Sequence, residues 1–399
     1  MTYDVNTPSI ARLWPYLPDW RSAYELRRSF LTDIITSRSN REQRRALRDV
    51  PRLSARHTSY VSGTELQAAK LYLRAWQNKP AAVPDFARWV ATTGSSGLGT
   101  DTLTIATPPA WIAVDRLIVL CDSGGTLELH TVESVVGSTV TIVGALAQAW
   151  PSGTVVRPAL FGLLDGQMQG SRVTRGDQRI ETNLTVYPGG EPPEDEGVAG
   201  TLFNSREIFE HEPNFSSQPS IDYIWPVEQV DYDIGRTAQF RPVDRAEQLI
   251  EAEFAGLTAD VAQSIEQFFL RMKGRRGSFY RSSCEKDMTL AANVAASTQM
   301  NVVGTALATL FGAIDYAANY VAIEIVQTDG TRLRRRITAI AVNGSNSRVT
   351  LSSAITTTLA TTARISWMPL VRFANDDLVT RWITPSKATI RASFQTVKQ

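Results

Sequence analysis

The feature that most constrains this sequence is a β-hairpin pattern that occurs twice. The stretches DSGGTLELHTVESV (122–135) and TDGTRLRRRITAI (328–340) each place a glycine turn beside a strand of alternating polarity. Aligned without a gap, Gly125 corresponds to Gly330, an offset of 205 residues. Because successive side chains of a strand point to opposite faces, a shared register has structural meaning. The pattern predicts that both halves of the chain contain the same hairpin.

The correspondence extends beyond the hairpins with small changes of offset. At an offset of 210, Leu163 corresponds to Phe373 and Ile180 to Ile390. Upstream, two segments with a helical period begin at Thr64 and Thr258, an offset of 194. The drift places the differences in length in connecting loops, where insertions cost little free energy. We therefore expect an internal duplication, against the alternative of a chance match between β-patterns.

Most of the remaining chain alternates with a period of two and is rich in Val, Ile and Thr, which predicts β-strands. The helical segments are 64–76 and 258–272, the second with Thr258 as candidate N-cap, while 23–35 has a mixed pattern. The predicted class is mainly β with α+β character. We expect two tandem similar β-sandwich units, each with one packed helix and an inserted small β-barrel-like domain.

The domain boundaries follow from the same pattern. The stretch GGEPPEDEGVAG (189–200) combines Pro, Gly and acidic residues, which indicates a solvated linker. The predicted units are 1–188 and 201–399. Their small β insertions are expected at about 91–156 and 291–365.

Composition excludes several classes of function. Lys and Arg number 41 against 40 Asp and Glu, so a net charge of +1 gives no global field for nucleic acid or anionic lipid. No stretch approaches the ~20 apolar residues that span a bilayer, and no signal-peptide pattern opens the chain. We expect a soluble protein without a membrane partner, in which Cys121 and Cys284 are buried thiols.

The sequence carries no recognisable catalytic, cofactor or metal pattern. It lacks a GxGxxG turn between strand and helix, a GxxxxGK[ST] loop, a GxSxG elbow and an HExxH helix. His57, His130 and His211 lie in separate segments without metal-ligand spacing. Asp376 and Asp377 fit a turn better than an acid–base pair. We expect no enzymatic activity and no cofactor.

Arginine-rich segments are the candidate functional residues. Guanidinium groups suit ion pairs across a subunit boundary or a polar lumen wall. Nucleic-acid binding is the alternative, favoured only where Phe279 and Tyr280 follow basic residues. The candidate interface or lumen residues are Arg38, Arg41, Arg44, Arg45, Arg48, Arg52, Arg275, Arg276, Arg334, Arg335 and Arg336.

Three stretches resemble a known family. LWPYLPDW (13–20), FLTDIITSRSNREQRRALRDVPR (30–52) and FFLRMKGRRGSFYRSSCEKDMTL (268–290) are similar to distal tail, or tail-tip (baseplate), proteins of long-tailed bacteriophages and prophages. The resemblance implies a β-sandwich belt that forms a ring at the end of the tail tube without catalysis. It also implies a place in the virion tail tip, assembled in the bacterial cytoplasm. The chain departs from the family where RSSCEKD replaces a segment that carries an aromatic residue.

The duplication and the resemblance together predict a trimer whose six similar units adapt a sixfold tube to a threefold hub, with a hexamer as the second choice. The expected partners are further copies, the tail tube protein, the hub and tail fibres, with DNA passing through the ring without sequence-specific binding. The alternative is a receptor- or carbohydrate-binding module. Its candidate sugar platforms are Trp89, Trp111, Trp150, Trp367 and Trp382. A tail-associated hydrolase lacks any catalytic set.

Overall fold

The computed structural model describes residues 12–397 except 38–40, 76–78, 123–124, 166–167, 192–194, 226, 232, 234, 236, 241–245 and 312–320. The described chain is mainly β, as predicted, with 29 strands and three helices. The first half contains β1 (Arg12–Leu13), β2 (Tyr24–Ser29), β3 (Thr32–Thr36), β4 (Glu42–Ala46), β5 (Arg52–Ser62), α1 (Gly63–Ala75), β6 (Pro80–Pro84), β7 (Val90–Ala91), β8 (Thr102–Thr104), β9 (Leu117–Cys121), β10 (Leu127–Val136), β11 (Thr139–Ile142), β12 (Val155–Leu164), β13 (Gly170–Arg172) and β14 (Asp177–Val186). The second half contains β15 (Leu202–Phe203), β16 (Arg206–Phe209), β17 (Ser220–Ile224), β18 (Glu228–Val230), β19 (Ala238–Phe240), β20 (Glu247–Thr258), α2 (Ala259–Met272), β21 (Phe279–Arg281), β22 (Val294–Val303), α3 (Ala306–Phe311), β23 (Ala322–Gln327), β24 (Arg332–Asn343), β25 (Asn346–Thr357), β26 (Thr362–Trp367), β27 (Leu370–Phe373), β28 (Asp377–Thr384) and β29 (Lys387–Thr396).

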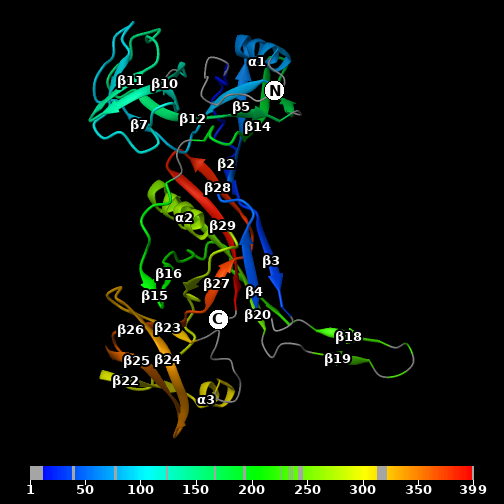
Figure 1. Cartoon of the computed structure of the whole chain (residues 1–399), viewed down its shortest axis with the longest axis vertical. Helices are drawn as coiled ribbons and strands as arrows, with labels where there is room; N and C mark the ends of the chain where they lie inside the picture. The colour runs from blue at the N-terminus through cyan, green and yellow to red at the C-terminus, as the bar shows by residue number, and fades with distance from the viewer. Residues whose placement is uncertain are drawn as a thin grey trace.

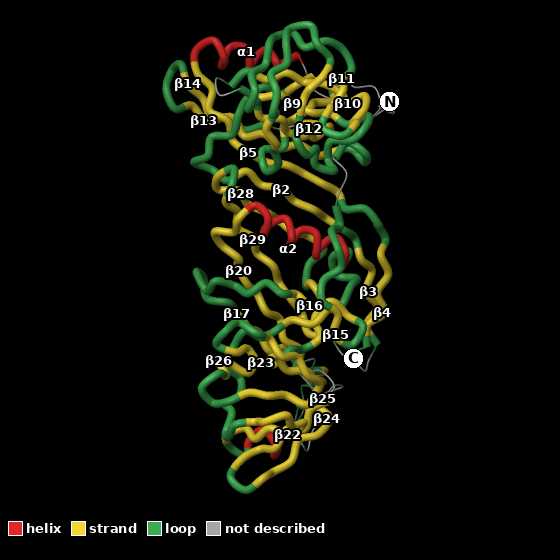
Figure 2. The backbone as a smooth tube through the Cα atoms, turned by 90° about the vertical axis from the view of Figure 1, so that its left-hand side faces the viewer, coloured by secondary structure: helices red, strands yellow, loops and turns green. Residues whose placement is uncertain are grey.

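The molecule is elongated. In Figure 1, α1 and the first insertion lie at one end, α3 and the second insertion at the other, and the β18–β19 hairpin projects to the side. Figure 2 shows α2 lying across the sheet that connects the two ends. The molecule therefore has a middle layer of sheet and helix with one small β-structure at each end.

One antiparallel sheet runs through both halves of the chain. Its strands follow in the order β13-β14-β5-β2-β28-β29-β20-β17. Strand β2 of the first half lies between its own neighbour β5 and strand β28 of the second half. The two predicted units therefore share continuous backbone hydrogen bonding, which the sequence did not indicate.

Strands of the two halves pair in the same order and at constant offsets. Ala55 of β5 faces Leu184 of β14, and Ile250 of β20 faces Phe394 of β29, offsets of 195 and 210. The predicted match of Leu163 with Phe373 is wrong by one residue, because Leu164 faces Leu184 where Phe373 faces Phe394. The segment between β27 and β28 in the second half is therefore one residue longer than the corresponding segment between β12 and β13 in the first half.

The two glycine hairpins form as predicted. Leu120 faces Glu128 in the pair β9–β10, and Ile325 faces Leu333 in the pair β23–β24, which keeps the offset of 205 on both strands. Each second strand then bulges at the corresponding place, after Val132 in β10 and Ile337 in β24. A shared bulge is informative because bulges are specific features of a strand and not random defects.

Each insertion encloses a separate hydrophobic core but does not close into a barrel. Leu103, Leu120 and Trp150 belong to the first of these cores. The second insertion is an open sheet in the order β22-β25-β24-β23-β26. Between its edge strands, residues 288–290 make only one bridge to β26 and one to β22. The expected barrel-like closure is therefore wrong for the described strands, since single bridges take the place of a closing strand.

The helices agree closely with the sequence pattern. α1 and α2 begin at Gly63 and Ala259, so their offset is 196 and not the predicted 194. Thr258 occupies the N-cap position of α2 but makes no side-chain capping hydrogen bond. The mixed segment 23–35 forms β2 and β3, and the short helix α3 was not predicted. None of the described helices is long and apolar enough to cross a membrane.

The acidic segment 189–200 is held in place over its described residues. Gln267 of α2 donates to Asp195 Oδ2 at 2.9 Å, and Arg271 of α2 donates to the carbonyl of Glu196. Arg116 of the first insertion donates to the carbonyl of Glu191 at 3.1 Å. The segment predicted to be a solvated linker thus lies against α2 and the first insertion.

Candidate subunit interface

The junction between β2 and β28 shows how the first half of this protein binds the second half. Six residues of β2 face six residues of β28 in an antiparallel register. On one side of the sheet, Arg381 Nε lies 2.9 Å from Glu25 Oε1, and Arg27 Nη2 lies 2.6 Å from Asp377 Oδ2. Exposed ion pairs contribute about 0.2–1 kcal/mol each. They specify the register of the junction more than they stabilise it.

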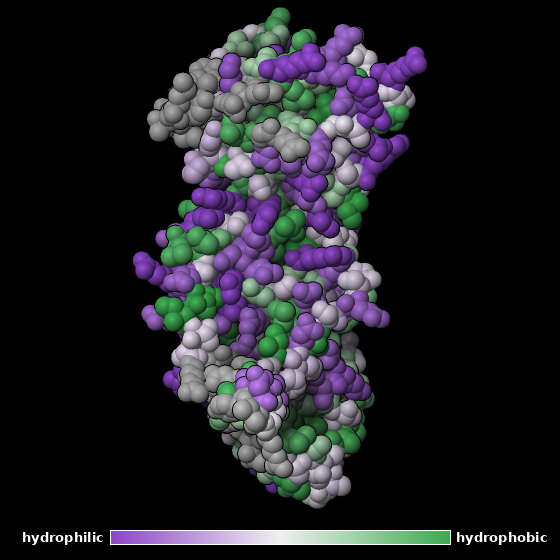
Figure 3. Space-filling view, turned by 90° about the vertical axis from the view of Figure 1, so that its right-hand side faces the viewer, coloured by the Kyte–Doolittle hydropathy of each residue, from purple (hydrophilic) through white to green (hydrophobic). Residues whose placement is uncertain are grey.

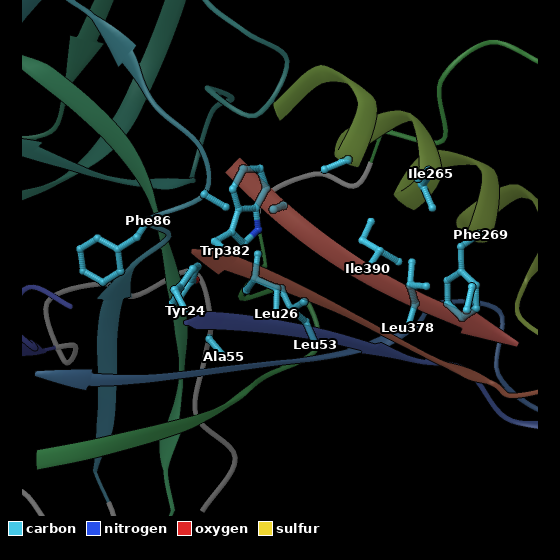
Figure 4. Packing of buried hydrophobic residues seen from close by; sticks show 14 of the residues in the cluster. Tyr24, Leu26, Leu53, Ala55, Phe86, Ile265, Phe269, Leu378, Trp382 and Ile390 are labelled. Atoms are coloured by element: carbon cyan, nitrogen blue, oxygen red, sulfur yellow. The ribbon is translucent and has the colours of Figure 1, made fainter. Parts of the chain in front are cut away.

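The other side of the junction is a hydrophobic core (Figure 4). Tyr24 and Leu26 of β2 and Trp382 of β28 pack in one layer with Ile265 and Phe269 of α2. All five side chains are at most 3% exposed. Burying a large apolar side chain contributes about 1.5–3 kcal/mol. The halves cannot separate without exposing this layer to water.

A buried ion pair crosses the same junction. Arg28 Nη1 of β2 lies 2.8 Å from Glu266 Oε1 of α2, and Thr380 of β28 donates to the same carboxylate oxygen at 2.6 Å. Both charged side chains are almost wholly buried. A buried pair is costly to break because it leaves an uncompensated charge. The pair therefore selects one partner and one register.

The arm formed by β3 and β4 also binds the second half. Arg372 of β27 donates from Nε and Nη2 to the two carboxylate oxygens of Glu42, at 2.9 and 2.7 Å. Burial opposes ionisation of Glu42, but these hydrogen bonds and the charges of Arg372 and Arg44 outweigh it and lower its pKa. Asp376 accepts from the backbone and hydroxyl of Thr32, both at 2.8 Å. The β3–β4 arm thus contacts the second half at Thr32, at the start of β3, and at Glu42, at the start of β4.

The strands that correspond to the junction are open at the opposite edges. Among the described strands, β17 pairs only with β20 and β13 pairs only with β14. By its pairing position, β17 corresponds to β2 and β13 corresponds to the middle of β28. Unpaired edge strands are templates for pairing with another chain. The molecule therefore presents one half-junction at each edge of its central sheet.

Large apolar side chains are exposed beside the open strand β17. Tyr223 and Trp225 are 56% and 54% exposed and stack on each other with ring centroids 6.3 Å apart. Ile224, Val227 and Phe240 nearby are also exposed. A cluster of exposed apolar residues on an edge strand marks a protein contact. Strand β17 and the β18–β19 arm have the surface expected of a subunit interface.

The sheet face opposite the helices is polar and carries both charge signs. A groove of about 660 Å³ runs over β2, β5, β14, β28 and β29. Cross-strand ion pairs join Arg56 to Glu181 at 2.8 Å and Arg391 to Glu253 at 2.7 Å. Figure 3 shows this side of the molecule, which is largely hydrophilic across its middle. Such a face suits contact with water, because its charges of opposite sign are paired across the strands.

The predicted arginines of the first arm have mixed positions. Arg44 lies 3.6 Å from Glu42, and Arg48 donates to the carbonyl of Ser29 at 2.8 Å. Arg41, Arg45 and Arg52 are exposed. Arg38 lies outside the described residues. The arginines of this segment that the structure brings to a contact thus bind within the chain.

The remaining predicted arginines also make contacts within the chain. The backbone of Arg275 donates to Asp376 at 2.9 Å, and Arg276 lies 4.0 Å from Asp49. Arg335 donates to the carbonyl of Ala354 at 3.2 Å. The backbone of Arg336, an exposed residue, donates to the hydroxyl of Ser352 at 3.2 Å. Their role as contacts between copies stays a prediction.

Arg334 belongs to an ion-pair network that the sequence analysis missed. It binds Glu210, and its Nε donates to Glu324 at 2.9 Å. Arg364 binds Glu212, whose pKa is lowered by hydrogen bonds from Arg364 and by the charges of Arg364 and Arg332. Glu324 is 1% exposed within the apolar strand AIEIVQ. A carboxylate at an inward position of such a strand was the signal that could have revealed the network.

The described residues offer no metal site, since they contain no group of three or more His, Cys, Asp or Glu side chains that could bind an ion. Cys121 and Cys284 are buried free thiols, as predicted. Burial raises the pKa of Cys121 to about 11, which disfavours the reactive thiolate. Asp376 and Asp377 accept hydrogen bonds from Thr32 and Arg27 at the arm and the junction.

No protein-family model matches the chain, and no curated protein matches its sequence.

Proposed function

We propose that this protein is a structural, non-enzymatic ring component of the tail tip of a long-tailed bacteriophage or prophage. Its two halves are tandem copies of one β-sandwich unit, each with a helix on the sheet and a small β insertion. The matching strand order, offsets and bulges of the halves support this duplication. The motif resemblance in 13–20, 30–52 and 268–290 supports the place in the tail.

The observation that carries the ring is the junction of β2 with β28. It joins the first edge of one unit to the opposite edge of the next, in a head-to-tail sense. A head-to-tail contact that repeats generates a closed ring when its rotation closes, and an open filament when it does not. Because the chain leaves one edge of each kind open, further copies can extend the sheet by the same contact.

The preferred ring is a trimer. Each chain contributes two similar units, so three chains give six units around a channel with threefold exact symmetry. Six units suit a sixfold tail tube on one side, and the differences between halves suit a threefold hub or fibres on the other. The polar sheet face, with ion pairs such as Arg391–Glu253, then lines the channel through which DNA passes. A hexamer of twelve units is the second choice.

Mass photometry and negative-stain imaging of the full-length protein test this function. The expected result is a particle of three chains with six lobes around a hole. A strictly monomeric protein at micromolar concentration, or a ring of six chains, contradicts the trimer. Imaging the ring together with tail tubes tests its place: end-on binding to the tube supports a tail-tip protein, and absence of binding contradicts it.

A second candidate function is carbohydrate or receptor binding, supported by one cavity. A space of about 450 Å³ lies between the first insertion and α2, lined by Trp89, Trp111, Asp260 and Gln263 among others. Aromatic faces with nearby carboxylates and amides suit a sugar ring. Trp89 is 53% exposed, whereas Trp150 and Trp382 are at most 3% exposed and cannot stack on a ligand.

The two functions are separable by a glycan array. A purely structural ring binds no glycan, and the wild-type protein is compared with Trp89→Ala on the same array. Binding that is lost in Trp89→Ala supports the sugar site. No binding by the wild type removes this second function and leaves the structural one.

A further inference from the structure

We infer that strand β17 of one copy pairs antiparallel with residues 168–172, which include β13, of the next copy, in the register that joins β2 to β28 within the chain. This inference rests on the ring proposed above and identifies the strands and side chains that close it. The occupant of both open edges is therefore a second copy of this chain.

The register follows from the pairings already described. Leu26 faces Ala55 in the first half, and Ile221 faces Ile250 in the second, so β17 follows β2 at an offset of 195. Gly170 faces Ile180 as Thr380 faces Ile390, so β13 follows β28 at an offset of 210. Because both strands keep their pairing positions, the register of β2 and β28 can be applied to β17 and β13 without a shift.

The transferred register pairs residues that suit a strand contact. The pair Glu25–Arg381 becomes Ser220 opposite Ser171, two exposed serines on adjacent edges. The pair Leu26–Thr380 becomes Ile221 opposite Gly170. Neither position brings like charges together, which is a frequent obstacle to pairing edge strands. The transferred junction is therefore electrostatically permitted.

The exposed aromatics in and beside β17 correspond to positions that are buried in the in-chain junction. Arg28 and Phe30, which are at most 3% exposed, correspond to Tyr223 and Trp225, which are more than half exposed. Within the chain, Phe30 packs on Phe269 of α2 with ring centroids 5.6 Å apart. The counterparts of Tyr223 and Trp225 are thus covered by α2 of the neighbouring half.

The helix of that neighbouring unit has the chemistry to receive them. α1 corresponds to α2 at an offset of 196, because the buried residues of the two helices match at that spacing. Glu266 then corresponds to Lys70, and Phe269 to Leu73, with exposed Arg74 following. Where the in-chain junction pairs Arg28 with Glu266, the junction between copies places Tyr223 against Lys70.

Both sides of the contact have changed together, from an ion pair to an aromatic ring and a cation. A tyrosine opposite a lysine, and a tryptophan beside a leucine and an arginine, form apolar and cation–π contacts. A contact with an unrelated protein would not explain why β17 and α1 of the same chain both differ from their counterparts in a complementary way. The ring then alternates two kinds of junction. One lies within each chain, and the other forms when two chains associate.

Disulfide trapping tests the register on the full-length protein. In the double variant Ser220→Cys with Ser171→Cys, oxidation should link successive copies and give a covalent trimer on a non-reducing gel. The two serines lie on opposite edges of an eight-strand sheet, about 34 Å apart at normal strand spacing, so a bond within one chain is excluded. The native thiols Cys121 and Cys284 are buried and form no background.

The matched control is Ser220→Cys with Arg172→Cys, in which the second thiol points to the other face of the sheet. Covalent trimer in the test variant, and its loss in the control, supports the inference. Trimeric rings that do not cross-link overturn this register and leave the proposed ring intact. Cross-linking without rings in the images overturns the proposed ring and leaves the strand pairing, and neither rings nor cross-links overturns both.

Discussion

Arg28 Nη1 and Glu266 Oε1 lie 2.8 Å apart, and this buried ion pair joins a strand of the first half to a helix of the second. Glu266→Ala should destabilise the protein by about 3–5 kcal/mol, because it leaves the guanidinium buried without a counter-charge. Urea unfolding measures this as a lower midpoint with an unchanged slope. Glu253→Ala removes the partner of exposed Arg391 and should cost at most about 1 kcal/mol. Equal effects of the two substitutions would contradict this account.

A double variant separates the loss of the pair from the cost of its burial. Arg28→Met with Glu266→Leu removes both charges and keeps most of the volume, so its stability should return to within about 2 kcal/mol of the wild type. The same urea experiment provides the comparison. If the double variant is as unstable as Glu266→Ala, the packing of these side chains matters more than their charges.

His57 gives the protein a specific sensitivity to acid. It packs between Tyr24 and Phe86, and burial lowers its pKa to about 4, a shift that the Tyr16 carbonyl opposes only in part. A lowered histidine pKa means that the unfolded chain binds the proton first. Stability is therefore complete above pH 6.5 and declines as the pH falls toward 4, by a total of about 3 kcal/mol.

Replacing His57 tests that dependence directly. His57→Leu keeps an uncharged side chain in the core and should reduce the loss of unfolding free energy between pH 6.5 and pH 4. Chemical unfolding of the wild type and the variant at both pH values gives the loss of unfolding free energy for each protein, and the two losses are compared. An unchanged slope with pH would assign the acid sensitivity to other groups, such as His211, whose pKa burial also lowers.

The glycines of the two hairpins should be equally intolerant of a side chain. Gly125 and Gly330 both have φ of +87°, and no atom lies closer than 3.8 Å to a Cβ added at either position. The cost of Gly→Ala is therefore conformational and amounts to about 1–2 kcal/mol at each site. Thermal unfolding should show similar shifts for the two variants. Gly176→Ala, which has open space and no left-handed φ, is the control and should change stability by less than about 0.5 kcal/mol.

These hairpins show what the sequence could reveal. Alternation, a turn glycine and an unbroken offset of 205 predicted β9–β10 and β23–β24, and local periodicity located α1 and α2 within one or two residues. Such features are local, because they depend on which face of a strand or helix meets a core. The sequence therefore predicted the two hairpins and the two longer helices, but not the short helix α3.

The contact between the halves could not be predicted from these local patterns. Leu26 and Thr380 face each other across 354 positions of sequence, and alternation specifies the buried face of a strand but not its neighbour. The arginine-rich pattern likewise gave no acidic partners, so the pairs Arg372–Glu42 and Arg334–Glu324 emerged only from the fold. Candidate residues were recognised by type, and their partners were decided by tertiary structure.

Two tryptophans with the same exposure distinguish the two functions. Trp225 and Trp89 are 54% and 53% exposed, so substitution by alanine removes a similar apolar surface from each. Trp225→Ala should abolish the trimer, because it removes a large anchor from the contact with the next copy, where such residues contribute 2 kcal/mol or more. Trp89→Ala should leave the trimer unchanged, since no residue of β17 lines the cavity beside it.

Mass photometry at matched concentration measures both variants, and circular dichroism confirms that each is folded. A loss of about 2 kcal/mol at each of three contacts lowers each association constant about 30-fold, so the trimer should dissociate at concentrations where the wild type is assembled. If Trp225→Ala remains trimeric and Trp89→Ala does not, the interface lies on the first insertion and not at β17. If both remain trimeric, the exposed aromatics of β17 contact another component, for which the tail hub is the proposed partner.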